Sequence, residues 1–384
     1  MLKRFEVKNY KNFKDKIVID FSKVGGYQFN IDCIANQMIG KMLIYGRNAT
    51  GKSNFGNALF DITTNLSNRR FIRIQQGMYM NADSVESYAE FMYVFQFQQD
   101  EVIYQYRKYS EIQLYDEELL LNGERCFYYN FDTKESHFDK LNYLEAETVV
   151  IERYLEAMNE NQNEEDEISR TLPFLRWLIR NTVLSSNSIL LKMDAYIKGM
   201  YMVTVGNMAM NRPRIIYDNF FETLADKDTL EDFEEFLNIM GIECKLVLEE
   251  LPDKQKVLYF KHERLVSFFE NASSGTMSLV NLYRILGRAR TANMVYIDEF
   301  DAFYHYEMAE NVIKFLKRKY PECQVIMTTH NTNLMTNQLM RPDCVFILSM
   351  RGNLTALCDA TPRELREGHN LEKMYISGEF ERYE

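Results

Sequence analysis

Met42–Ser53, MLIYGRNATGKS, is the stretch that decides the fold of this chain. Its first four residues are apolar or aromatic and predict a buried strand. The next eight residues fit the pattern G-x-x-x-x-G-K-S, in which the fixed positions are Gly46, Gly51, Lys52 and Ser53. Apolar residues then recur at helical spacing, at Phe55, Ala58, Leu59 and Ile62. The stretch therefore predicts a strand, a glycine-rich loop and an amphipathic helix in succession.

This succession is suited to binding the phosphates of a nucleotide. The backbone N–H groups of a glycine-rich loop can point inward because no Cβ obstructs them, and the following helix directs its positive end at the same point. We expect Lys52 to reach the β- and γ-phosphates and the Ser53 hydroxyl to hold Mg²⁺. An ordinary strand–turn–helix is the alternative, and the strand before and the helix after the loop favour the phosphate site.

Length and composition bound the class of protein. The 384 residues are 46% hydrophobic and 26% charged, which is typical of a globular protein of one large domain or two. The net charge of −11 argues against a chain whose whole surface binds nucleic acid, and it leaves a local basic patch open. The charged N-terminus is not a signal peptide, and no apolar run approaches the ~20 residues of a membrane span. Six scattered cysteines without a C-x-x-C motif favour reduced thiols in the cytoplasm.

The N-terminal region predicts a β-hairpin ahead of the glycine-rich loop. Phe5–Val7 and Ile17–Phe21 have the pattern of strands on either side of a polar turn. In that turn Lys11, Asn12 or Phe13 could touch a nucleotide, and a solvated turn is the more common alternative.

The middle of the chain changes from strands to helices. Residues 84–130 predict a meander of hairpins, with turns at Gln99–Glu101 and at Asn122-Gly123. In this meander Gln96 or Gln98 could sense Mg²⁺ and the γ-phosphate, although a plain strand residue is the more common case for either. From about Leu141 to Leu237 apolar residues recur at helical spacing, and residues 245–248 and 256–261 then predict strands. The acidic run at 159–166 is expected to be a solvated loop. Arg69, Arg70 and Arg73 form a small basic cluster. These residues could contact phosphates or could form a solvated helix end.

Two motifs in the C-terminal part of the sequence are suited to phosphoryl transfer. Ser273–Thr276, SSGT, precedes a predicted helix at 277–289, where small residues form either an anion-binding nest or an ordinary cap. Residues 294–297 predict a buried strand that ends in Asp298-Glu299. Adjacent carboxylates at a strand end suit phosphoryl transfer, because one can hold the Mg²⁺ shell and the next can polarise the attacking water.

A histidine ends the next predicted strand. Residues 324–329, QVIMTT, predict a buried strand that is followed directly by His330. Ligands in open α/β sheets bind beyond the carboxyl ends of the strands. We therefore expect His330 to face the γ-phosphate, although a lone histidine at such a position is more often structural.

The ordered set GRNATGKS, SSGT, MVYIDEFD and TTH resembles the nucleotide-binding head of ABC-type ATPases, in particular their SMC-like and OLD-like branch. The stretch HNLEKMYISGEF resembles the tail of stand-alone bacterial ATPases of this branch, many of which belong to anti-phage or abortive-infection systems. The resemblance implies an α/β P-loop NTPase fold, with a mixed central sheet, an antiparallel β subdomain and an inserted helical subdomain. The corresponding division is residues 1–135 and 246–384 for the two parts of the head and 136–245 for the helical insert.

The resemblance also implies a role for each matching residue. Asp298 is the Walker B acid that holds Mg²⁺ together with Ser53, Glu299 is the catalytic base, and His330 is the switch histidine. Ser274 and Gly275 match the signature, which reaches across to the nucleotide of another subunit, and Asp301 is the D-loop aspartate. ATP contacts are implied for the Walker A residues Gly46, Asn48, Ala49, Thr50, Gly51, Lys52 and Ser53 and for Asn54. Such heads typically work as head-to-tail homodimers or higher oligomers. Only Ser274-Gly275 matches the L-S-G-G-Q signature of transporters, which weakens the expectation of ATP-driven pairing.

Three functions follow from the resemblance. The first is an ATP-hydrolysing sensor that regulates a partner effector, a nuclease or toxin, in defence against phage. This is favoured because no long heptad arm is present and the 54 residues after His330 are too few for a Toprim nuclease domain. The second is an SMC-like DNA-binding ATPase, whose groove would be lined by Arg284, Arg288, Arg290, Lys317, Arg318 and Lys319. The third is a transporter subunit, which the long insert and the divergent signature disfavour.

Overall fold

The computed structural model describes residues 1–66, 78–138, 140–145, 149–160, 171–204, 215–288 and 292–383. Some of the predicted features lie outside these ranges. They are the basic cluster of Arg69, Arg70 and Arg73, the separate residue Arg290, and all of the acidic run except its first two residues. Within them, no helix combines the length and the apolar character that a membrane crossing requires.

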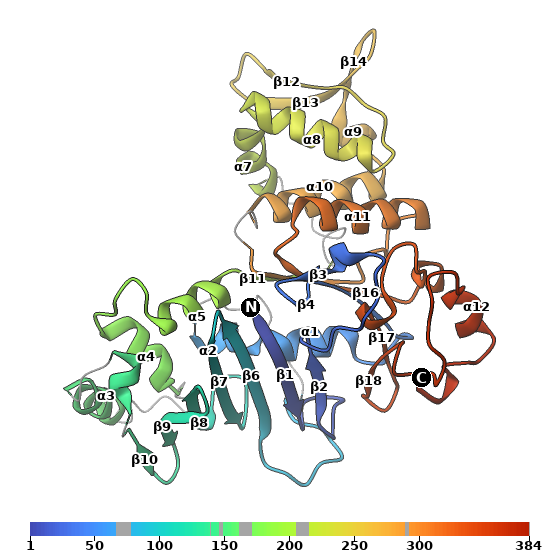
Figure 1. The fold of residues 1–384 in the computed structure, drawn as a ribbon. Coiled ribbons are helices and arrows are strands. Elements are labelled where there is room, and N and C mark those ends of the chain that lie inside the picture. Colours follow the sequence, from blue (N-terminus) through green and yellow to red (C-terminus); the bar gives the residue numbers. More distant parts are fainter. Residues whose placement is uncertain are drawn as a thin grey trace.

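The nucleotide motifs lie on a six-stranded sheet in the middle of the molecule (Figure 1). Its strand order is β11-β15-β16-β5-β17-β18, parallel except for the last strand. The bounds are β5 Lys41–Tyr45, β11 Met200–Thr204, β15 Met294–Asp298, β16 Gln324–Thr329, β17 Val345–Leu348 and β18 Leu354–Ala356. Strands β5, β15 and β16 are buried along their whole length. The three apolar runs predicted as buried strands are thereby confirmed, and all three end at the same edge of the sheet.

A second sheet of seven antiparallel strands has the order β10-β9-β8-β7-β6-β1-β2. Its bounds are β1 Leu2–Lys8, β2 Ile17–Asp20, β6 Ala89–Phe97, β7 Asp100–Lys108, β8 Leu114–Leu121, β9 Glu124–Asn130 and β10 Ser136–His137. The predicted N-terminal hairpin and the predicted meander are both confirmed. At the β8–β9 turn, Asn122 and Gly123 have positive φ angles of 52° and 80°, as a two-residue turn that matches the strand twist requires.

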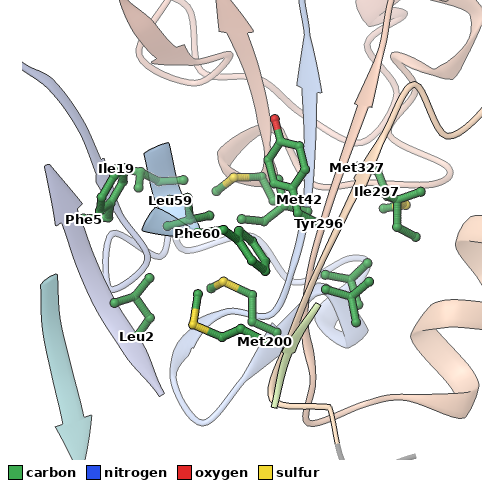
Figure 2. Packing of buried hydrophobic residues seen from close by; sticks show 14 of the residues in the cluster. Leu2, Phe5, Ile19, Met42, Leu59, Phe60, Met200, Tyr296, Ile297 and Met327 are labelled. Carbon is green, nitrogen blue, oxygen red and sulfur yellow. The ribbon is translucent and has the colours of Figure 1, made fainter. Parts of the chain in front are cut away.

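Helix α1 (Lys52–Leu59) joins the two sheets, because it contacts β15 on one side and β1 on the other. Helix α2 (Asp61–Leu66) continues from it. Figure 2 shows the resulting core, in which Leu2, Phe5 and Ile19 from the antiparallel sheet meet Leu59 and Phe60. Met42, Tyr296 and Met327 from the central sheet pack in the same cluster. Helix α1 is therefore packed between the two sheets, and β5, the strand of the same motif, belongs to the central sheet.

The described helices between β10 and α10 form two groups (Figure 1). Helices α3 to α5 lie beside the antiparallel sheet, and α7, α8 and α9 form a separate lobe with a three-stranded sheet. Helices α10 and α11 lie between this lobe and the central sheet. The helical bounds are α3 Val149–Glu160, α4 Phe174–Asn181, α5 Ile189–Lys198, α7 Ile215–Leu224, α8 Lys227–Ile239, α9 Phe268–Asn271, α10 Ser274–Arg288, α11 Tyr306–Lys319 and α12 Leu371–Ile376. The remaining strands are β3 Ile34–Ala35, β4 Met38–Ile39, β12 Leu246–Glu250, β13 Lys256–Lys261 and β14 Leu265–Ser267.

One part of the helical expectation is wrong. Met200–Thr204 lies within the stretch predicted to be helical, yet it forms β11 and pairs in parallel with β15, so that Thr204 lies opposite Asp298. The sequence MYMVT is a short apolar run, which periodicity cannot assign to a helix or a strand. Pairing with β15 decides it.

Candidate functional site

The loop between β5 and α1 has the backbone conformation of an anion-binding nest. Ala49 and Gly51 have positive φ angles of 67° and 100°. Gly46 is packed so tightly that a Cβ there would lie 2.6 Å from Thr50 Oγ1, and its N–H donates to the main-chain oxygen of Thr329. Asn48 and Ala49 are exposed, whereas Thr50 is buried and its hydroxyl donates to Arg47 O at 3.0 Å. The fixed glycines are thus required by close contacts and by backbone angle, and the middle of the loop stays accessible.

Lys52 is held inside this loop. Its Nζ donates to Gly46 O at 2.6 Å and to Arg47 O at 3.1 Å. Burial lowers the pKa of Lys52, and the carboxylates of Asp298, Glu299 and Asp301 act in the opposite direction. A buried ammonium with carboxylates nearby is in place to meet phosphate oxygens at the loop.

Ser53 and Asp298 are in direct contact. The Ser53 hydroxyl donates to Asp298 Oδ2 at 2.5 Å, and the Thr328 hydroxyl donates to Asp298 Oδ1 at 2.8 Å. Because the proton of Ser53 is directed at the carboxylate, the lone pairs of its oxygen remain available to a cation. A hydroxyl and a carboxylate beside a phosphate loop are the oxygen ligands that Mg²⁺ takes together with nucleotide phosphates. These residues therefore fit the ion that the sequence predicts.

Glu299 and Asp301 follow in the loop after β15. Glu299 is half-buried and has a φ of 50°, in the left-handed region. Asp301 is buried, its Oδ2 accepts a hydrogen bond from the Thr329 hydroxyl at 2.7 Å, and its Oδ1 accepts none from the described part of the chain. Burial raises the pKa of Asp301. The buried carboxylate is thus held at one of its oxygens by the Thr329 hydroxyl.

His330 lies at the same edge of the sheet as the phosphate loop. It directly follows β16, whose last residue Thr329 pairs with Tyr45 at the end of β5. The imidazole is exposed, and the next residue, Asn331, donates its backbone N–H to the Thr329 hydroxyl. The predicted Walker A, Walker B and switch residues are therefore brought together.

Ser274 and Gly275 are the first two residues of α10, so the helix begins three residues earlier than predicted. Ser273 provides the cap, because its Oγ accepts a hydrogen bond from the Thr276 N–H at 3.1 Å. A Cβ on Gly275 would lie 3.0 Å from Phe303 O, so α10 begins against the loop that carries Asp301. Among the described residues, no hydrogen bond joins Ser274 or Gly275 to the phosphate loop of the same chain.

Neither candidate glutamine is brought to the site. The Gln96 side chain donates to the main-chain oxygens of Gln98 and Asp100 within its own hairpin. Gln98 lies in the turn, with a φ of 58°. The start of β1, at Leu2, pairs with this end of β6. The other end of β1 leads into the turn whose Asn12 contacts the phosphate loop. The strand pattern could not reveal which end of the hairpin faces the nucleotide.

Sequence reasoning underrated Asn12. This residue lies in the turn between β1 and β2, where a solvated position was the preferred expectation. Asn12 is exposed, as that expectation has it, and in addition its Nδ2 donates to Thr50 O at 3.0 Å and its Oδ1 accepts from Asn54 Nδ2 at 2.8 Å. A Cβ at Gly51 would lie 2.1 Å from Asn12 Nδ2. Sequence reasoning also missed Thr328, Thr329 and Tyr296. The hydroxyl of Tyr296 donates a hydrogen bond to Lys52 O.

Two of the basic side chains proposed to line a DNA groove form ion pairs with carboxylates of the same chain. Lys317 is buried, and its Nζ lies 2.8 Å from Asp32 Oδ1. Lys319 Nζ lies 2.6 Å from Asp232 Oδ1. Arg318 is exposed.

The fold and the motif-bearing edge define a P-loop NTPase fold of the ABC-ATPase head type. Residues 209–336, a third of the chain, match the family model described as "AAA domain, putative AbiEii toxin, Type IV TA system". Comparison with curated protein sequences gives no match.

One solved structure of an SMC head shares the fold, and further SMC heads align with this chain at lower TM-scores. An SMC head bound to the C-terminal winged-helix domain of ScpA is 19% identical, with 90% of this chain and 93% of that chain covered and a TM-score of 0.50. The SMC head domain of Thermotoga maritima is 16% identical, with 90% and 94% covered and a TM-score of 0.45. An SMC head with an extended coiled coil, bound to the C-terminal domain of ScpA from Pyrococcus furiosus, is 19% identical, with 99% of both chains covered and a TM-score of 0.47. At these identities the first likeness concerns the fold alone.

Proposed function

We propose that this chain is an ATP-binding and ATP-hydrolysing head of the OLD-like type that pairs head to tail and regulates a partner effector. The observation that carries the ATPase proposal is the convergence of Lys52, Ser53 and Asp298 at one sheet edge. The 2.5 Å contact between Ser53 Oγ and Asp298 Oδ2 joins two motifs that are 245 residues apart in the sequence.

Each residue has a defined task in this proposal. The N–H groups of residues 46–54 and the Lys52 ammonium bind the phosphates, and Ser53 and Asp298 hold Mg²⁺. When bound, Mg²⁺ neutralises charge on the phosphate oxygens. Glu299 orients and deprotonates the attacking water, and His330 donates a hydrogen bond to the γ-phosphate.

Head-to-tail pairing completes the site in this proposal. Ser274 is exposed and Gly275 is half-exposed at the start of a 15-residue helix, and among the described residues no hydrogen bond joins either of them to the phosphate loop of the same chain. The neighbouring Asp301 Oδ1 is buried without a donor. We assign both to contacts with a second copy and its nucleotide. We also propose the division of the chain into two head parts, 1–135 and 246–384, and a helical insert, 136–245. One amendment is needed, because β11 lies within the insert and extends the central sheet of the head.

The regulatory role rests on the family description. It names a putative toxin of a type IV toxin–antitoxin system, which is a system of two components. The role in defence against phage and the partner effector are extended from the resemblance of the sequence motifs to stand-alone ATPases of anti-phage systems. The ion pairs of Lys317 and Lys319 give no support to DNA as the partner.

The test is the Glu299→Gln variant, studied with and without ATP-Mg²⁺ after expression with the neighbouring gene products. We expect ATP hydrolysis to fall at least about 100-fold, because the general base is lost. Native mass should show an ATP-dependent dimer or larger assembly that carries a neighbouring protein. The exposed Glu249→Gln variant is the control and should behave as wild type.

Two results would contradict the proposal. Unchanged hydrolysis in Glu299→Gln would remove Glu299 from the chemistry. A monomer under both conditions would remove the paired mechanism.

A further inference from the structure

Thr328 joins the two carboxylate residues at the end of β15. It is the penultimate residue of β16 and has no exposed surface. Its hydroxyl donates to Asp298 Oδ1 at 2.8 Å and accepts a hydrogen bond from the Glu299 backbone N–H at 2.8 Å. A hydroxyl has one proton and two lone pairs, so both bonds can form at once.

The backbone of Glu299 needs such support. Its φ of 50° is in the left-handed region, which a non-glycine residue occupies only where its surroundings hold it. Thr328 provides this hold on both sides of the Glu299 residue. Its hydroxyl oxygen accepts a hydrogen bond from the Glu299 N–H, and its main-chain oxygen accepts one from the Phe300 N–H at 3.1 Å.

We propose that Thr328 is a positioning residue for ATP hydrolysis, which sets the direction of the Glu299 carboxylate and the orientation of Asp298. The Asp298 carboxylate is held at both oxygens, by Thr328 on Oδ1 and by Ser53 on Oδ2. Loss of the Thr328 hydroxyl frees one side of that carboxylate and releases the turn at Glu299. Both acids then lose their fixed relation to the phosphate loop. This inference rests on the proposed ATPase function.

The experiment replaces the hydroxyl without changing the shape of the side chain. In Thr328→Val we expect kcat to fall about 100-fold, since small displacements of a catalytic group have effects of that size. Among the described residues, no hydrogen bond joins Thr328 to the phosphate loop or to Lys52. The affinity for ATP without Mg²⁺, measured with a fluorescent ATP analogue, should therefore stay within about twofold. The Mg²⁺ concentration that half-saturates nucleotide binding should rise.

A second pair of variants separates the hydroxyl from packing. Thr328→Ser and Thr328→Ala both lack the methyl group, and only the serine keeps the hydroxyl. We expect the serine variant to retain kcat within about threefold of wild type and the alanine variant to lose it as the valine variant does. This comparison decides the proposal even if the valine variant does not fold.

Thr361 offers a matched control. It is also buried, its hydroxyl also donates to a carboxylate, Glu379 Oε1 at 2.8 Å, and it also accepts a backbone N–H, from Arg363. Thr361→Val should keep wild-type kcat. Equal kcat in wild type and Thr328→Val, or equal losses in the serine and alanine variants, would overturn the role of Thr328. Absence of ATP hydrolysis by the wild type would instead refute the proposed function.

Discussion

At the scale of single residues, Gly51 serves the loop in two ways. Its left-handed φ shapes the nest, and its missing side chain lets Asn12 approach the backbone. In a trans peptide the carbonyl and the following N–H point in opposite directions. Since Asn12 binds Thr50 O, the Gly51 N–H is held on the side away from Asn12. A residue of the antiparallel sheet thus fixes a peptide of the phosphate loop.

We predict that Asn12→Ala weakens ATP binding about tenfold, because two hydrogen bonds that orient the loop are lost. Titration with a fluorescent ATP analogue measures this effect. Asn54→Ala removes only the bond to Asn12 Oδ1 and should have a smaller effect. Unchanged affinity in a folded Asn12→Ala protein would show that the loop keeps its conformation without this contact.

At the scale of elements, a buried ion pair anchors α2 to β7. Lys108 has no exposed surface, and its Nζ lies 2.9 Å from Asp61 Oδ2. The hydroxyls of Tyr79 and Tyr106 also donate to the Asp61 carboxylate, and Lys108 donates to Asn65 as well. The helices that follow the phosphate loop are therefore attached to the antiparallel sheet by a polar network in a largely apolar interface.

We predict that Lys108→Met lowers the free energy of unfolding by about 3–5 kcal/mol, because the Asp61 carboxylate stays buried without its counterion. Urea unfolding measures this loss. The double variant Asp61→Leu with Lys108→Met should lose less than the sum of the two single variants, since no charge remains buried. Lys227→Met removes an exposed pair with Glu231 and should have little effect. Additive losses would mean that the two side chains act independently.

At the scale of the whole molecule, the phosphate loop and the signature helix belong to opposite halves of a pair in our proposal. Each site then takes Lys52 from one copy and Ser274 from the other. In a mixed pair of one Lys52→Ala copy and one Ser274→Glu copy, one site has both defects and the other has neither.

We predict that mixing these two inactive variants restores ATP hydrolysis. Random pairing makes about half of the pairs mixed, each with one intact site, so recovery should reach about a quarter of the wild-type rate. Each variant alone is the control. If the mixture stays as inactive as its components, Lys52 and Ser274 act within a single chain.

The sequence by itself determined the strands and loops that carry the nucleotide-binding motifs. The strand–loop–helix at residues 42–62 and the strands that end at Asp298 and Thr329 are local patterns, in which apolar runs and glycine spacing state the conformation directly. The order of these motifs was enough to predict that Lys52, Asp298 and His330 lie at one edge of the sheet, because parallel strands bring their carboxyl ends to one edge.

Tertiary structure alone decided the remaining points. Whether Met200–Thr204 is a strand depends on pairing with β15, and which end of the β6–β7 hairpin faces the loop depends on how the two sheets pack. Asn12 and Thr328 carry no motif, because a turn asparagine and a strand threonine are common residues. Their importance comes from partners far away in the chain, and hydrogen bonds between distant segments leave no periodic signal in the sequence.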